Sequence, residues 1–309
     1  MATIPDALNL AVQHHQAGRL PEAEALYRQA LQAHPDHPEA LHRLGLIAHQ
    51  TGRHDDAVEY IGRALRLNPG VAEYHNNIGT VYRALGKLEE AAVHYRQALA
   101  LQPAYAMAHN NLGGTFSEQG KLEEAIVHYR QALALQPAYA EACNNLGIAL
   151  RALGKLEEAV VHYRQALALQ PALAEACYNL GNTLKEQGKL EEAIVLYRQA
   201  LALRPAYAMA HNNLGNALKE QFKLDEAVAH YRQALAVQPD YADAYSNLGI
   251  VLFNQGKFGE AAVQSRQALA LKPDFVEAHV NLGNALIEQG KLEEAVVHYR
   301  RALALKPDY

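Results

Sequence analysis

Asparagine recurs at one place in a regular pattern along the chain, and a primary amide repeated in this way could bind the backbone of another polypeptide. An amide carries both N–H donors and a carbonyl acceptor, which are the groups that pair with an extended peptide. The interval is 34 residues, and Arg43 takes the second place in the series. We predict that the eight asparagines form a peptide-binding row: Asn9, Asn77, Asn111, Asn145, Asn179, Asn213, Asn247 and Asn281.

Two other interpretations of these asparagines stay open at the level of sequence. Each amide could bond the adjacent repeat, or the residue could be a by-product of copying one unit. Copying is evident, because Ala-Tyr-Ala-Met-Ala-His-Asn-Asn-Leu-Gly occurs at residues 104–113 and again at 206–215. We favour peptide binding, because asparagine is a mediocre helix former whose side chain competes for backbone hydrogen bonds.

The other reactive side chains show no spacing that predicts catalysis, a metal site or a cofactor. Cys143 and Cys177 are one interval apart, and helices stacked about 8–10 Å apart hold cysteines too far from each other for a disulfide. Paired glutamates open predicted helices, where they suit the helix dipole. We therefore expect a non-enzymatic chain. Five of the 16 histidines occur once per interval, without the close spacing of metal ligands: His94, His128, His162, His230 and His298.

The element that carries all these residues is a 34-residue repeat. A proline marks its end at Pro35 and then every 34 residues up to Pro307, so that position 1 of the first repeat is Ile4. The register holds over nine repeats: 4–37, 38–71, 72–105, 106–139, 140–173, 174–207, 208–241, 242–275 and 276–309. The asparagine row is position 6 of this repeat.

Each repeat predicts two helices. In residues 106–139, apolar residues recur at helical spacing in two stretches, and Gly120 separates them at position 15, where a helix end tolerates positive φ. Small residues at positions 8, 20 and 27 permit close helix packing, and tyrosine at position 24 of seven repeats fills the remaining space. Phe222 replaces the position-15 glycine in the seventh repeat. We expect a locally altered turn there, with the ring either exposed or covering an apolar gap.

This pattern resembles the tetratricopeptide repeat (TPR) over residues 4–309. The resemblance implies an all-α, right-handed superhelical solenoid that forms a single domain, with the first helix of each repeat lining a concave groove. The asparagine row and the segment Tyr178–Ala193 further resemble the TPR arm of O-linked N-acetylglucosamine transferases and their bacterial relatives. That resemblance implies a scaffold that recruits substrates for a protein O-glycosyltransferase-like protein. The alternative is a stand-alone adaptor that assembles a multiprotein complex.

Composition narrows the expected partners to other proteins or extended peptides. The formal net charge of −5 shows no bias toward nucleic acid or anionic membranes. The chain has no apolar run of about 18 residues and no secretory signal, and its two cysteines fit a reduced, cytoplasmic setting. Leu292, Val296 and Leu303 in the last repeat resemble the interior residues of earlier repeats. We therefore expect a longer parent protein, or self-association through an uncapped C-terminal repeat.

Overall fold

The computed structural model describes residues 4–308, and every regular element in that range is an α-helix. The first helices of the repeats are α1 (Ile4–Gln16), α3 (Pro38–Gln50), α5 (Ala72–Ala84), α7 (Ala106–Glu118), α9 (Ala140–Ala152), α11 (Ala174–Glu186), α13 (Ala208–Glu220), α15 (Ala242–Asn254) and α17 (Val276–Glu288). The second helices are α2 (Leu20–Ala33), α4 (His54–Leu67), α6 (Leu88–Leu101), α8 (Leu122–Leu135), α10 (Leu156–Leu169), α12 (Leu190–Leu203), α14 (Leu224–Val237), α16 (Phe258–Leu271) and α18 (Leu292–Leu305).

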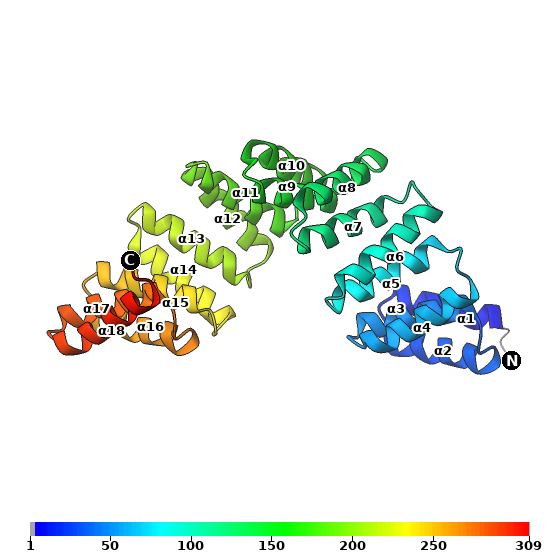
Figure 1. Ribbon diagram of the computed structural model, residues 1–309, viewed down its shortest axis with the longest axis horizontal. Helices are drawn as coiled ribbons and strands as arrows, with labels where there is room; N and C mark the ends of the chain where they lie inside the picture. Colours follow the sequence, from blue (N-terminus) through cyan, green and yellow to red (C-terminus); the bar gives the residue numbers. More distant parts are fainter. Residues whose placement is uncertain (1–3, 309) are drawn as a thin grey trace. The chain divides into compact units, whose positions relative to one another are not determined.

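Each first helix begins at the residue at which the sequence places the start of a repeat. The chain divides into two compact units, which we call unit 1 (residues 1–158) and unit 2 (residues 159–309), and the division lies inside α10. Within each unit, the two helices of a hairpin pack together, and the second helix packs on the first helix of the next repeat (Figure 1). The predicted all-α repeat architecture is therefore confirmed.

The two helices of a hairpin cross closely because glycine at position 8 meets tyrosine at position 24. A Cβ atom added to Gly113 would lie 2.8 Å from Cε1 of Tyr129 and 3.1 Å from the carbonyl oxygen of Ala125, closer than real Cβ atoms pack. A Cβ on Gly215 would lie 2.7 Å from Cε1 of Tyr231. In these repeats a larger residue at position 8 would force the ring or the helix to shift, which is the packing role predicted for the small residues. The first repeat carries Ala11 at position 8 and still buries Tyr27.

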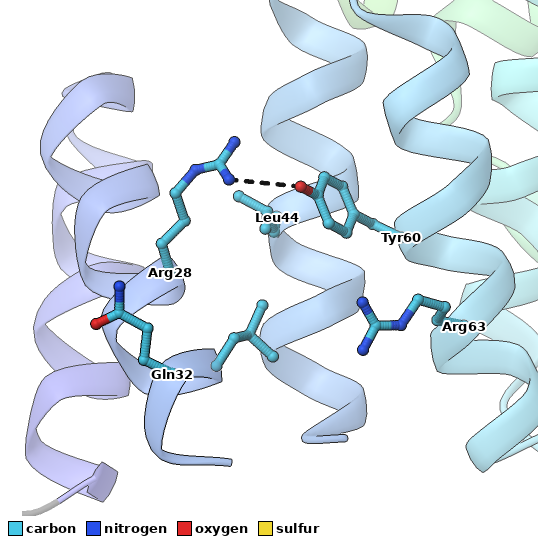
Figure 2. Close-up of a pocket in the computed structure, with 6 residues that line it drawn as sticks. Arg28, Gln32, Leu44, Tyr60 and Arg63 are labelled. Carbon is cyan, nitrogen blue, oxygen red and sulfur yellow. Dashed lines mark hydrogen bonds between the residues drawn. The ribbon is translucent and has the colours of Figure 1, made fainter. Parts of the chain in front are cut away.

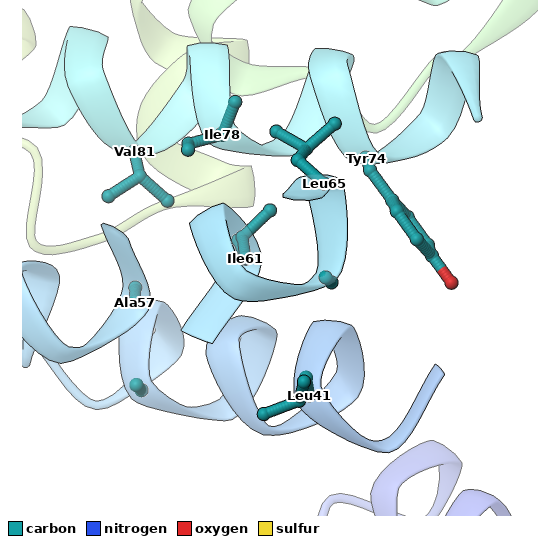
Figure 3. Close-up of a cluster of buried hydrophobic side chains, with 9 residues drawn as sticks. Leu41, Ala57, Ile61, Leu65, Tyr74, Ile78 and Val81 are labelled. Carbon is teal, nitrogen blue, oxygen red and sulfur yellow. The ribbon is translucent and has the colours of Figure 1, made fainter. Parts of the chain in front are cut away.

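Successive hairpins share their hydrophobic core. Figure 3 shows one such cluster in unit 1, where Leu41 from α3, Ile61 and Leu65 from α4, and Ile78 and Val81 from α5 are buried against one another. Each repeat thus covers the apolar face that its predecessor leaves open, as expected for repeats that cannot bury a core alone.

The turn at Phe222 has the same backbone course as the glycine turns. Phe222 adopts φ of +58°, close to the +75° of Gly120. The N–H of Lys223 donates to the Leu218 carbonyl at 3.0 Å, as Lys121 does to Phe116 at 2.8 Å. The expectation of an altered turn is therefore wrong, because this bond holds the left-handed conformation even at the conformational cost that a side chain brings. The expectation of an exposed ring is confirmed, since Phe222 is 88% exposed.

Two further expectations concern the cysteines and the membrane. Cys143 and Cys177 are free and buried, as predicted. None of the helices from α1 to α18, which cover the described part of the chain, has the length and apolar character needed to span a bilayer.

Candidate functional site

The predicted asparagine row lies on the first helices, and each member that follows another repeat of its own unit bonds that preceding repeat. In unit 1, Nδ2 of Asn111 donates to Oδ1 of Asn76 at 3.0 Å, and Nδ2 of Asn145 donates to Oδ1 of Asn110 at 3.1 Å. The amide at position 6 thus reaches the side chain at position 5 of the repeat before it. Asn9 on α1 is exposed, whereas the other seven members are partly buried.

The same bond occurs in unit 2. Nδ2 of Asn247 donates to Oδ1 of Asn212 at 3.0 Å, and Nδ2 of Asn281 donates to the Ser246 hydroxyl at 3.1 Å. These position-5 partners were missed at the level of sequence. The visible signal was the run of asparagine at positions 5 and 6, which occurs at 76–77, 110–111, 144–145 and 212–213.

Asn213 differs from the other members of the row because more of its amide's hydrogen-bonding groups have partners within the chain. Its Nδ2 lies 3.1 Å from the Tyr178 hydroxyl and 2.9 Å from Oδ1 of Asn182, so both of its N–H donors have internal partners. Its Oδ1 also accepts from Nδ2 of Asn212 at 3.3 Å. For Asn111 and Asn247, the inter-repeat bond uses one N–H, and an amide carries a second N–H and a carbonyl oxygen.

The partner of Asn77 is a histidine instead of an amide, because His42 stands at position 5 of the second repeat. Nε2 of His42 accepts from Nδ2 of Asn77 at 2.9 Å, which requires an unprotonated Nε2. Burial, together with the neighbouring Arg43 guanidinium, lowers the pKa of His42 to about 4. The imidazole is therefore neutral near pH 7 and replaces the asparagine carbonyl as the acceptor.

A second line of polar contacts connects position 24 with position 9 of the same repeat. The hydroxyls of Tyr197 and Tyr231 donate to Oδ1 of Asn182 and Asn216, each at 2.8 Å. The Tyr299 hydroxyl donates to Asn284 at 2.6 Å. This pair supplies a partner for the hydroxyl of a buried ring, as buried polar groups require.

The pair is broken in the eighth repeat, where a small cavity opens. Position 24 is Ser265, whose hydroxyl donates to the carbonyl of Ala261 at 3.0 Å, and position 9 is Ile250. The tyrosine ring that would reach position 9 is missing. We call the resulting cavity the unit 2 notch; it has a volume of about 170 Å³ and is lined by Ile250, Phe253, Asn254, Asn281 and Asn284.

A notch at the equivalent place in unit 1 lies between α1 and α3. Here position 24 is Tyr27 and position 9 is Val12, which offers no hydrogen bond. Arg43 stands at position 6 of the following repeat. We call this cavity the unit 1 notch; it has a volume of about 290 Å³ and is lined by Val12, His15, Gln16, Tyr27, Arg43, Leu46 and Gln50. The unit 2 notch is smaller than the pockets that enclose small molecules, which measure roughly 300–1,000 Å³, and the unit 1 notch lies at the lower limit of that range.

A third recess, of about 270 Å³, lies among α2, α3 and α4 and contains two arginines (Figure 2). Arg28 lies 3.5 Å from the Tyr60 hydroxyl and pairs with Glu24 at 2.8 Å. Arg63 donates to the Pro35 carbonyl at 2.9 Å and lies 3.6 Å from Asp36. Carboxylates of the chain itself therefore compensate both charges in this recess.

Histidines that look isolated in the sequence meet in pairs across the hairpins. Nδ1 of His109 on α7 lies 3.1 Å from Nδ1 of His128 on α8, and Nε2 of His109 donates to the Pro103 carbonyl at 3.3 Å. The Nδ1 atom of His109 is therefore the acceptor and His128 the donor. Equivalent pairs join His75 to His94, His211 to His230, and His279 to His298. Within residues 4–308, no three His, Cys, Asp or Glu side chains gather as metal ligands would.

Comparisons with known proteins agree with this architecture. A family model described as "TPR repeat" matches residues 79–120, 115–154, 147–188, 181–221, 223–256 and 251–287. Models described as "Tetratricopeptide repeat" match residues 8–72 and 276–309. No curated protein sequence matches the chain.

Solved structures with a similar fold include a chain of the APC/C hetero-tetramer Cut9-Hcn1, at 20% identity and a TM-score of 0.69 over 86% of this chain. The present chain spans only 52% of that protein's length. PilF of Pseudomonas aeruginosa matches with 23% identity and a TM-score of 0.62, over 67% of this chain and 94% of its own. MamA matches with 27% identity and a TM-score of 0.50, over 55% of this chain and 92% of its own. At such identities, the Cut9 and PilF likenesses concern the fold alone.

Proposed function

The chain belongs to the tetratricopeptide repeat family, and from this premise we propose that it is an interaction scaffold that binds an extended polypeptide along the first helices of each unit. Proteins of this kind present a surface built from many equivalent positions, and the surface needs no reacting group. The described residues offer no metal cluster, and the proposal assigns no catalysis to the chain.

The observation that carries the proposal is the fixed orientation of the position-6 amides. The bond from Asn111 to Asn76, and its equivalent from Asn247 to Asn212, immobilises each side chain before a partner arrives. A group that is already ordered loses little further entropy on binding, so it contributes more of its hydrogen-bond energy to affinity. Bonding the adjacent repeat and binding a peptide are therefore compatible roles for one amide.

The narrower proposal is that this scaffold recruits substrates for a protein O-glycosyltransferase-like protein. Its support is the asparagine row. An amide can hydrogen-bond to the peptide backbone, which is the same in every sequence, so the row suits polypeptides of varied sequence. The second candidate is a stand-alone adaptor. An adaptor that joins two proteins needs a second binding surface, and the second helices offer one. Position 22 of those helices exposes valine in both units: Val93 and Val127 in unit 1, and Val161, Val195, Val263 and Val297 in unit 2.

The row can be tested by comparing Asn247→Ala with Asn213→Ala. The probe is a fluorescein-labelled, end-capped peptide of alanine, serine and glycine, which offers little beyond its backbone. We expect Asn247→Ala to weaken binding by roughly tenfold, which corresponds to about 1.4 kcal/mol. Asn213→Ala should change the affinity little, because both N–H donors of Asn213 already have internal partners.

Fluorescence anisotropy gives the affinities, and urea unfolding serves as the control for folding. Asn247→Ala removes one inter-repeat hydrogen bond and should lose about 1 kcal/mol of unfolding free energy, whereas Asn213→Ala removes two and should lose about 2 kcal/mol. Equal affinities for wild type and Asn247→Ala would contradict the proposal, and so would an equal loss of affinity in the two variants.

A further inference from the structure

The histidine pairs bring two ring nitrogens face to face. In the third repeat, Nδ1 of His75 on α5 lies 3.2 Å from Nδ1 of His94 on α6. The ring centroids are 5.5 Å apart, so both nitrogens lie between the rings and point toward each other. The nitrogen of a neutral imidazole that carries no hydrogen can bind a metal ion as well as accept a hydrogen bond. The fold therefore places two metal-binding groups together.

Both rings of this pair are held in place by other contacts. Nε2 of His75 donates to the Pro69 carbonyl at 3.2 Å, which leaves Nδ1 of His75 without a hydrogen. Histidines that bind metals commonly donate their other ring N–H to a backbone carbonyl, which fixes the orientation of the ring. Tyr82 stacks on the His94 ring with centroids 5.4 Å apart. The two rings are thus oriented before an ion arrives.

The number of ligands decides which kind of ion suits the pair. Within residues 4–308, no third His, Cys, Asp or Glu side chain joins these two histidines. Zinc favours four ligands, and divalent copper and nickel favour at least as many. Two nitrogens that face each other suit monovalent copper, Cu(I), which accepts two ligands in a line. At metal–nitrogen distances of about 2 Å, the two Nδ1 atoms separate from 3.2 Å to about 4 Å. Both side chains are partly exposed and can rotate by this amount.

We propose that the His75–His94 pair is a two-ligand binding site for Cu(I), which links α5 to α6. The ion takes the place of the hydrogen that joins the two nitrogens. That hydrogen leaves Nδ1 of His94 for water, and Nε2 of the same ring takes up another, so both rings stay neutral and no net proton is released. No electron is transferred, because the copper arrives and stays in the monovalent state. The site lies within one hairpin and does not depend on the asparagine row.

A neighbouring charge distinguishes the other histidine pairs from this one. In the fourth repeat, the Arg96 guanidinium lies 5.4 Å from the centre of the Phe116 ring, and that ring stacks on His128 with centroids 5.5 Å apart. Arg96 is position 25 of the preceding repeat. The two pairs of unit 2 have the equivalent arginines as neighbours, Arg198 and Arg266. A positive charge at this place repels a bound cation.

The His75–His94 pair lacks this arginine, because Gly62 takes position 25 of the second repeat. Burial, followed by His75, lowers the pKa of His94, and no arginine contributes. A lysine at position 16 is common to the third and fourth repeats and lies over the position-11 ring in each, at 6.0 Å and 5.8 Å. The arginine is therefore the difference in charge between the two. We expect the pair of the third repeat to bind the ion most tightly.

The test uses Ag(I), which shares the preference of Cu(I) for two ligands and is not oxidised in air. Silver nitrate is titrated into the full chain, labelled with ¹⁵N-histidine, in a chloride-free buffer near neutral pH. The readout is the ¹⁵N NMR signal of Nδ1 in His75 and His94, which reports on this site whatever the two cysteines bind. We expect both signals to shift saturably over the same range of Ag(I) concentration. Zinc sulfate at equal concentration should leave them in place.

Three variants separate the effect of the ligands from that of the neighbouring charge. His94→Gln should abolish the shift at His75, because one imidazole alone binds weakly. Gly62→Arg installs the arginine of the other repeats without changing a ligand and should weaken Ag(I) binding by several-fold. A Cβ atom at Gly62 would meet no atom closer than Nη1 of Arg66, at 3.7 Å, so a side chain fits there. Gly62→Gln is the neutral control of similar length and should bind like the wild type. Circular dichroism checks that each variant keeps its helices.

The copper site is overturned if Ag(I) shifts neither histidine signal, or if zinc binds the pair as tightly as Ag(I) does. It is also overturned if His75 binds Ag(I) in His94→Gln with the affinity of the wild type, since a single ring would then account for binding. Equal affinities in Gly62→Arg and Gly62→Gln would contradict the presence of a cation at the pair.

Discussion

The unit 1 and unit 2 notches occupy the same place in the repeat but present opposite chemistry. The unit 1 notch keeps its tyrosine, Tyr27, loses the partner of the hydroxyl and gains the charge of Arg43. The unit 2 notch loses the ring, because Ser265 replaces tyrosine, and is lined by neutral amides such as Asn281. Both arise where the pair between positions 24 and 9 is broken. In both places a local exception to the repeat accompanies the notch.

The largest effect should come from breaking an intact pair. Tyr231→Ser removes a fully buried ring from unit 2 and leaves Asn216 without its partner. We expect a loss of about 3–5 kcal/mol in the free energy of unfolding, as for other deletions of buried rings, and a new notch beside Asn216. Urea unfolding measures the first result and a crystal structure the second. A loss below about 1 kcal/mol would mean that the ring does not fill the place assigned to it.

The reverse substitution should close the unit 2 notch. Ser265→Tyr places a ring against Gly249, as Tyr231 lies against Gly215. Burying the ring should stabilise the chain by about 1.5–3 kcal/mol, and the melting temperature should rise accordingly. Ser265→Ala is the matched control, since it also removes the hydroxyl but adds no ring. If Ser265→Tyr unfolds more easily than Ser265→Ala, neighbouring side chains already fill the space and the notch has another cause.

A smaller change in the free energy of unfolding is expected at the turn of Phe222, where the substitution alters backbone strain and leaves both notches intact. Phe222 lies in unit 2 with a positive φ and an exposed ring. Phe222→Gly should therefore raise the free energy of unfolding by about 1 kcal/mol. Gly120→Phe, at the equivalent turn of unit 1, should lower it by a similar amount. Circular dichroism during urea titration measures both, and changes of the same sign in the two variants would contradict this account of the turn.

The smallest expected effect is a loss of stability at low pH. It should occur in both units, because each contains histidine pairs. Burial, followed by the neighbouring His109 and Arg96, lowers the pKa of His128 from 6.5 to about 4. On acidification the unfolded chain takes up this proton near pH 6.5, while the folded chain does so only near pH 4. Stability should therefore be lost as the pH falls through this window.

The expected loss for this partly buried group is a fraction of the roughly 1.4 kcal/mol that one pKa unit represents. His128→Gln should reduce the slope of unfolding free energy against pH. His54→Gln, in another repeat, is the control and should leave the His128 contribution in place. An unchanged slope in His128→Gln would show that the proton is taken up elsewhere.

Most of the architecture could be predicted from local patterns. The 34-residue period, the position-15 glycines and the pairing of glycine with tyrosine each depend on residues close together in one hairpin. Every first helix consequently begins where the sequence places it. The turn at Phe222 was predicted wrongly. A side chain disfavours positive φ, which suggested a different backbone conformation, but the hydrogen bond from Lys223 to the Leu218 carbonyl keeps the turn in the same conformation as the glycine turns.

By itself, then, the sequence determined the helices, their order and the residues that each repeat buries, because these follow from spacing within a few turns of helix. The tertiary structure decided which polar atoms meet. The partner of Asn111 lies 35 residues away at Asn76, and the partner of His128 lies on the other helix of its hairpin. It also decided that the Tyr27 hydroxyl and Nε of Arg43 have no hydrogen-bond partner. Such contacts depend on differences of about an ångström in the packing of separate helices, and residue type and spacing do not specify distances that fine.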